Sequence, residues 1–275
     1  APDDRAGGFY LSDILTQQPA VMRRARAWGH STKEAHVMFR LSFLVAAILL
    51  SASCAPQQRD PLEEGARLMG ELRMASGGAA LDAPQGFHET GTVVANGETS
   101  TYETWGDFYS LRWSGTRTAG GVTRASGFDG RAAWTAGADG VVQTDTSPEA
   151  LANARLGAYL TNAAYLYPDR FPARFEYKGR QESDGVAYDV VTVTPADSVP
   201  IDFWLDVETH RLARLSGMDG DTPFLGIVQR YKEIDGVLVM FASRQRAGDM
   251  EMLHSLTLYE FIAVPEARLA QAASR

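Results

Sequence analysis

The stretch YDVVTVTPADSVPIDFWLDVETHRLARL, residues 188–215, decides the fold. Apolar and polar side chains alternate along it, and it is rich in Val, Ile, Phe and Trp, which fit a pleated, half-buried surface. Strand-like segments at 188–195, 201–206 and 210–218 are separated by turn-forming residues. Short strands joined by turns indicate a meandering antiparallel sheet.

The same pattern extends in both directions from this stretch. Further strands are predicted over 224–234, 237–247 and 252–264, and the period of two begins upstream at Gly86. Turn signals occur at Asn96-Gly97, Gly120-Gly121, Asp129-Gly130, Asp139-Gly140 and Asp235-Gly236. Helical spacing is confined to residues 61–78 and 147–167. The sequence therefore predicts a mainly β (α+β) fold in which about 10–11 antiparallel strands curl into a barrel or half-barrel beside two helices.

Residues 41–50, LSFLVAAILL, form the only strongly apolar run in the chain. The run has about half of the roughly 20 residues that cross a bilayer. Arg40 precedes it and three small residues follow it, as in a secretory signal. We expect a signal peptide over 38–53, starting at Met38, and an upstream or mis-annotated segment over 1–37. The alternative is a cytoplasmic tail with the apolar run as its anchor.

Cys54, the only cysteine, lies at the end of the predicted signal. Residues 50–54, LSASC, resemble the lipobox of bacterial lipoproteins, although Ser51 stands where that family usually has Leu, Val or Ile. The resemblance implies lipidation of Cys54, a tether over 54–61, and a protein anchored to the periplasmic face of the outer membrane, because Ala55 follows the cysteine. The alternative is ordinary secretory cleavage near this point, which would give a soluble periplasmic protein.

Composition and motifs exclude several function classes. The formal net charge of −8 argues against nucleic acid as a partner, and one cysteine excludes an internal disulfide framework or a cysteine-rich zinc site. The histidines lack metal-binding spacing, and neither a nucleophile elbow nor a phosphate-binding loop occurs. Asp202 and Asp206 are interpreted as a solvated strand face, with a hydrolase using a carboxylate pair as the weaker alternative. We therefore expect no enzymatic activity, no cofactor and no metal site.

Three segments resemble a known family. Residues 127–134, 188–215 and 229–247 are similar to the outer-membrane lipoprotein carrier and sorting proteins, the LolA/LolB-like family. In the second segment the resemblance is carried by Phe203, Trp204, Leu205, Asp206, Thr209 and Leu212. The chain is also similar to the N-terminal half of some bacterial retropepsin-like aspartyl proteases, but it has no Asp-Thr-Gly or Asp-Ser-Gly. The resemblance implies a single half-barrel domain over 62–264, a tail over 265–275, and an apolar cavity for acyl chains.

Large apolar side chains at alternating strand positions and on the second helix are the candidates for the cavity lining. They are Tyr109, Leu111, Trp113, Trp134, Leu160, Tyr165, Phe203, Leu205, Val239, Phe241, Leu256 and Leu258. We expect a periplasmic-side lipoprotein that binds acyl chains or similar amphiphiles, in lipoprotein sorting or envelope lipid handling. The alternative is an envelope scaffold or sensor with a filled core, or an accessory domain related to those that precede aspartyl proteases. An internal cavity would distinguish a binding protein from a scaffold or sensor with a filled core.

Overall fold

The computed structural model describes residues 59–219 and 222–270. The predicted leader, the signal peptide and the lipidation site at Cys54 lie outside these described residues. Within the described ranges, no helix has both the length and the apolar character needed to cross a membrane.

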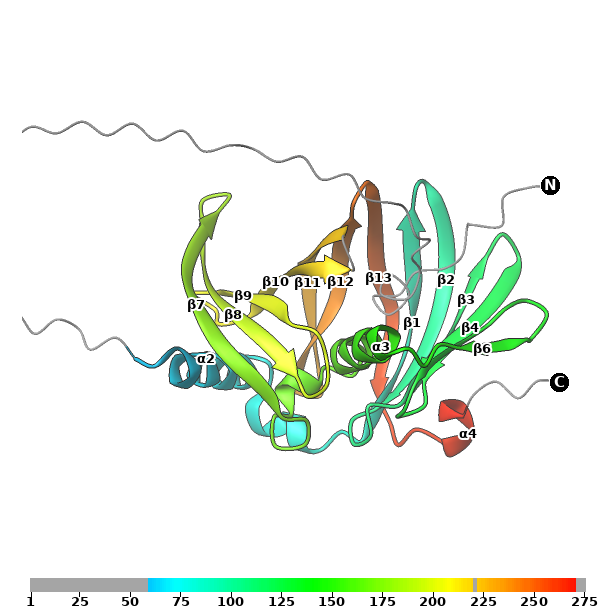
Figure 1. Cartoon of the computed structure of the whole chain (residues 1–275), viewed down its shortest axis with the longest axis horizontal. Helices are drawn as coiled ribbons and strands as arrows, with labels where there is room; N and C mark the ends of the chain where they lie inside the picture. Colours follow the sequence, from blue (N-terminus) through cyan, green and yellow to red (C-terminus); the bar gives the residue numbers. More distant parts are fainter. Residues whose placement is uncertain (1–58, 220–221, 271–275) are drawn as a thin grey trace, which may run out of the picture. The chain divides into compact units, whose positions relative to one another are not determined.

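Thirteen strands in the described part of the chain form one antiparallel sheet, in the order β6-β5-β4-β3-β2-β1-β13-β12-β11-β10-β9-β8-β7. The strands are β1 (Gly86–Ala95), β2 (Glu98–Asp107), β3 (Trp113–Ala119), β4 (Val122–Phe128), β5 (Ala133–Ala136), β6 (Val142–Thr144), β7 (Ala173–Ser183), β8 (Val186–Pro195), β9 (Ile201–Asp206), β10 (Leu212–Asp219), β11 (Thr222–Ile234), β12 (Val237–Ala247) and β13 (Met250–Phe261). The first and last strands pair at the centre, and β6 and β7 are the free edges. Because the edges do not meet, the sheet is an open half-barrel, as predicted (Figure 1).

The predicted hairpin turns are present between consecutive strands. Asn96 and Gly97 join β1 to β2 with φ of 51° and 80°, and Asp235 and Gly236 join β11 to β12 with φ of 51° and 79°. Positive φ at both central residues matches the right-handed twist of the flanking strands, and Asn-Gly and Asp-Gly tolerate it best. These dipeptides therefore fix the register of the two hairpins.

Helix α2 (Pro61–Ala75) confirms the first predicted helix, and the short 3-10 helix η1 (Gly78–Asp82) follows it. The Asp60 carboxylate caps α2 by accepting a 2.7 Å hydrogen bond from the backbone N–H of Leu62. The helix packs against β7 and β8 and buries Leu68, Met69 and Leu72. It closes one side of the half-barrel.

Helix α3 (Pro148–Thr161) contacts both β5 and β8, two strands that are far apart in the sheet. The sheet must therefore curve around this helix, as Figure 1 shows. The sequence predicted one helix over 147–167, and this was wrong at its end. Asn162 caps α3, Ala163 adopts a left-handed φ of 45°, and the 3-10 helix η2 (Ala164–Leu166) continues in a new direction.

Two other segments differ from the sequence-based expectation. Strand β7 was missed because charged side chains such as Arg174, Lys178 and Arg180 obscure its alternation, and such charges are common on edge strands. Within the predicted tail over 265–275, the short helix α4 (Glu266–Leu269) is docked. Leu269 is 3% exposed, and the Glu266 carboxylate accepts hydrogen bonds of 2.7 and 2.9 Å from Arg112.

Candidate ligand-binding cavity

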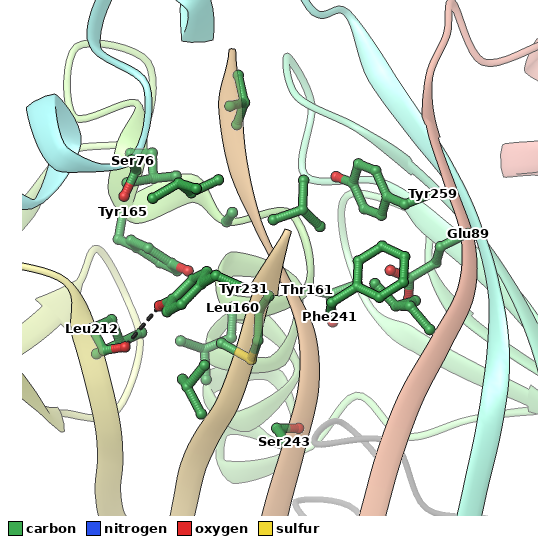
Figure 2. A pocket seen from close by; sticks show the side chains of 18 of the residues that line it. Ser76, Glu89, Leu160, Thr161, Tyr165, Leu212, Tyr231, Phe241, Ser243 and Tyr259 are labelled. Atoms are coloured by element: carbon green, nitrogen blue, oxygen red, sulfur yellow. Dashed lines mark hydrogen bonds between the residues drawn. The ribbon is translucent and has the colours of Figure 1, made fainter. Parts of the chain in front are cut away.

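A cavity of about 220 Å³ lies against the central strands of the half-barrel and is partly open to solvent. Its walls come from β1, β2, β10, β11, β12 and β13, and its cover comes from α2, η1 and residues 160–167 (Figure 2). Most of the lining is apolar and includes Leu72, Leu81, Phe108, Leu166, Leu212, Leu215, Val237 and Phe261. The half-barrel therefore encloses space and is not filled by its own side chains.

Several predicted residues meet in this cavity. Leu160 and Tyr165 approach from the α3–η2 segment, while Val239, Phe241 and Leu256 line the sheet side. The Tyr165 ring packs edge-on against Phe203, with 5.0 Å between ring centroids. The strand alternation and the second helical segment thus bring residues far apart in sequence to one space.

Other predicted residues are buried away from the cavity. Phe203 and Leu205 are 0% and 2% exposed and belong to the main core. Trp113 packs with Phe128 under α3, in a second cluster. The Trp134 ring covers Gly127, where a Cβ atom would lie 2.7 Å from the ring.

The remaining candidates lie at the edge of the core or on its surface. Leu111 is half-buried and packs against both clusters. Tyr109 is 55% exposed, and the Arg170 guanidinium lies 4.1 Å from its ring centroid. For all twelve candidates, including those that line the cavity, the ligand-binding role stays a prediction.

A β-bulge in β13 explains why Leu256 and Leu258 point in opposite directions. Thr90 pairs with Leu258 and Gly91 pairs with Leu256, so Thr257 has no partner across the ladder. The extra residue shifts the alternation by one position. Leu258 is consequently 43% exposed, whereas Tyr259 joins Leu256 in the cavity lining.

Polar side chains in the cavity were not predicted from the sequence. Glu89 and Tyr259 lie on one side of the cavity, and the hydroxyl of Tyr231 donates a 2.7 Å hydrogen bond to the Leu212 carbonyl on the other (Figure 2). Within the described residues, Gln245 Oε1 and His254 Nε2 are buried without a hydrogen-bond partner. The alternation of side chains along β1 could have identified Glu89, because it places Glu89 on the same face as the apolar Phe87 and Val93.

The ionisable groups of the cavity are shifted toward their uncharged forms. Burial raises the pKa of Glu89 to about 8, and a hydrogen bond from Thr104 opposes the shift. Burial also raises the pKa of Tyr165 to about 12 and that of Tyr259 well above its ordinary value. Burial, with the nearby Arg117, lowers the pKa of His254 to about 4. At neutral pH the cavity is apolar with uncharged hydrogen-bonding groups.

The two carboxylates considered for a hydrolytic pair have local roles. Asp202 accepts a 2.5 Å hydrogen bond from the Thr192 hydroxyl. Asp206 Oδ1 accepts from the backbone N–H groups of Thr209 and Glu208 at 2.8 and 3.1 Å, which stabilises the turn after β9. Among the described residues, no three His, Cys, Asp or Glu side chains are placed to hold a metal ion.

Solved structures of similar shape identify the fold. A DUF1329 family protein from Desulfovibrio piger aligns at a TM-score of 0.55 with 13% identity, over 79% of this chain and 100% of that one. A LolA superfamily protein from Nitrosomonas europaea aligns at 0.53 with 11% identity, over 75% and 97%. The chain has a LolA-like fold. A putative outer membrane lipoprotein-sorting protein domain from Vibrio parahaemolyticus, at 0.52 with 12% identity over 75% and 96%, agrees with this.

The LolA-like half-barrel predicted from the segments at 127–134, 188–215 and 229–247 is therefore confirmed as a fold. No protein-family model matches the chain, and no curated protein matches it. At identities of 11–13% the similarity concerns the fold alone. Function must be argued from the cavity.

Proposed function

We propose that this LolA-like protein is a non-enzymatic lipoprotein that binds acyl chains or similar amphiphiles, in lipoprotein sorting or envelope lipid handling. The observation that carries the proposal is the cavity of about 220 Å³ between the sheet and the α3–η2 segment. An acyl chain that enters such a space gains about 25 cal/mol for each Å² of apolar surface removed from water. Uncharged groups at the wall add hydrogen bonds without the cost of burying charge.

The rival function is an envelope scaffold or sensor, or an accessory domain like those that precede aspartyl proteases. In that reading the half-barrel is a filled structural core. Unpartnered polar atoms of Gln245 and His254 at the cavity wall favour the binding function, because buried polar atoms normally have partners. A ligand or water would supply those partners.

The binding function is tested by a matched pair of glycine substitutions. Gly226 lines the cavity, and a Cβ atom there would meet only ordinary contacts, the nearest at 3.4 Å. Gly226→Leu therefore fills the cavity with little backbone strain. Gly217→Leu, on the neighbouring strand β10 and outside the lining, is the control, with its nearest contact at 3.6 Å.

The measurement is titration of a fluorescent fatty acid into each purified protein, with mass spectrometry of any co-purified lipid. We expect Gly226→Leu to weaken binding about tenfold or more, because the leucine side chain occupies space that the acyl chain needs, and forcing both into it costs about 1–3 kcal/mol. Gly217→Leu should bind like the parent protein. If the parent protein neither binds the probe nor carries lipid, the scaffold function is supported instead.

The proposed location is the periplasmic face of the outer membrane, with an anchor at Cys54 and a soluble periplasmic protein as the alternative. Several acyl chains give stable anchoring, since each buried CH₂ adds about 0.8 kcal/mol. Cell fractionation of the full chain and its Cys54→Ser variant tests this. We expect the parent protein in the outer membrane and the variant in the soluble periplasm. An unmodified Cys54 in the mature protein would remove the anchor from the proposal.

A further inference from the structure

Glu89 is a carboxyl group on the apolar side of a central strand. Phe87 and Val93, on the same face of β1, are each 1% exposed. Across the ladder Glu89 pairs with Tyr259 of β13 and Thr104 of β2. Figure 2 shows Glu89 and Tyr259 together on one side of the cavity. The carboxyl group therefore faces the space that an acyl ligand would occupy.

Nothing in the lining compensates a negative charge on Glu89. The lining contains no Lys or Arg within the residues that the structure describes. The cations around the cavity act on other lining residues. Arg230 and Lys232 lie over the ring of Phe241, Arg117 acts on His254, Arg211 acts on Tyr231, and Arg73 and Arg170 act on Tyr167. The other titratable groups that line the cavity are Tyr102, Tyr165, Tyr167, Tyr231, His254 and Tyr259.

Carboxylates on the opposite face of the same strands have a different environment from Glu89. There Glu103 and Glu260 each contact a ring nitrogen of His88, at 2.9 and 2.7 Å. Those carboxylates have a nitrogen partner, whereas Glu89 has the Thr104 hydroxyl. A carboxylate without a cationic partner in an apolar space takes up a proton and becomes a hydrogen-bond donor. Tyr259, opposite Glu89 in the ladder, places a second hydroxyl group in the cavity lining.

A neutral donor at an apolar wall matches an uncharged hydrogen-bond acceptor. We propose that Glu89, as a carboxylic acid, donates a hydrogen bond to the carbonyl oxygen of an acyl ligand, so that the cavity selects acyl esters or fatty acids over alkyl chains that lack the carbonyl. This inference rests on the proposed acyl-binding function and adds its chemical selectivity. An ammonium group as the ligand would instead need an ionised Glu89, and a phosphate would find no cation in the lining.

The test compares two probes that differ only in the carbonyl group. A 1-monoacylglycerol and a 1-O-alkylglycerol of equal chain length are titrated into the purified protein by calorimetry. We expect the ester to bind about three- to tenfold more tightly, the usual contribution of one hydrogen bond. A fatty acid of the same length identifies the source of the carbonyl: tighter binding than the ester indicates the free acid, and weaker binding indicates the ester.

Three variants make the result specific to Glu89. Glu89→Leu should lose the preference for the ester while it still binds the ether, which also shows that it is folded. Glu89→Gln keeps a donor and should keep the preference. Glu98→Gln, an exposed position on the neighbouring strand β2, should change nothing.

The outcomes separate this inference from the proposed function. Equal binding of ester and ether by the parent protein, or a preference that survives in Glu89→Leu, overturns the role of Glu89 and leaves acyl binding intact. Failure of both probes to bind the parent protein overturns the proposed function, and the selectivity with it.

Discussion

At the scale of single residues, Glu89 and His254 place an acid and a base in the same cavity, and burial acts on them in opposite directions. Burial raises the pKa of Glu89 from 4.5 to about 8 and lowers that of His254 from 6.5 to about 4. Folding thus favours the neutral form of both groups. Above pH 4.5 the unfolded chain loses the Glu89 proton, whereas the folded protein keeps it up to about pH 8. Below pH 6.5 the unfolded chain binds a proton on His254, whereas the folded protein leaves His254 unprotonated down to about pH 4.

The consequence for Glu89 is a stability that falls as pH rises. Between pH 5 and 8 the unfolding free energy should decrease by up to about 1.4 kcal/mol per pH unit, because the folded state binds more protons than the unfolded state. In Glu89→Gln this decrease should vanish, and urea unfolding at several pH values measures it. Glu98→Gln, at an exposed site, is the control and should keep the parent slope. Equal slopes in the parent protein and Glu89→Gln would contradict an acid buried in the neutral form.

For His254 the change of unfolding free energy with pH has the opposite sign. Below pH 6.5 the unfolded chain binds a proton that the folded protein excludes until about pH 4, so stability should fall as pH drops through this window. His254→Gln should remove that loss. Urea unfolding at pH 4.5 and 6.5 measures it, and a loss of the same size in the variant would show that other groups cause it.

The sequence identified apolar lining residues but not these polar ones, for a physical reason. A charged residue in an alternating strand is normally solvated, so Glu89 carried no signal unless its face was known. The burial of Phe87 and Val93 shows that the face of β1 that carries Glu89 points into the core. The pairing of β1 with β13 is needed to establish this. Tyr165 and Phe241, by contrast, were recognisable because large apolar side chains seldom face water.

At the scale of elements, local irregularities limited what the sequence could predict. Turn dipeptides such as Asn96-Gly97 are local signals and located the hairpins. The bulge at Thr257 depends on pairing with β1, so the alternation alone placed Leu258 on the wrong side of its strand. The end of α3 likewise depends on a contact distant in sequence, between Asn162 and the Leu111 carbonyl.

That contact gives a prediction for the α3–η2 segment. The Asn162 amide donates hydrogen bonds to the carbonyls of Leu111 and Ala158, at 2.9 and 3.0 Å, and the residue is fully buried. Asn162→Ala leaves the Leu111 carbonyl without this donor, and we expect a loss of about 1–3 kcal/mol in unfolding free energy. Urea denaturation measures it, with the exposed amide variant Gln229→Ala as control. An unchanged midpoint would show that the helix end is held by packing alone.

At the scale of the whole molecule, the cavity volume limits the size of the ligand that the protein can enclose. A volume of about 220 Å³ is below the roughly 300–1,000 Å³ of pockets that bury drug-sized ligands. We therefore expect a long acyl chain to fill the enclosed space with part of its length and to leave the remainder at the side that is open to solvent. The sheet and the α3–η2 cover together bound that space.

This limit predicts how affinity depends on chain length. While added CH₂ groups enter the cavity, each contributes about 0.8 kcal/mol, or about a fourfold increase in affinity. Once the cavity is full, further carbons should add little, so a series of monoacylglycerols measured by calorimetry should rise and then level off. In Gly226→Leu the plateau should begin at a shorter chain, because the leucine occupies part of the same space. Affinity that rises at a constant rate through the longest chains would mean that the cover moves aside, and a plateau unchanged by Gly226→Leu would place the ligand elsewhere.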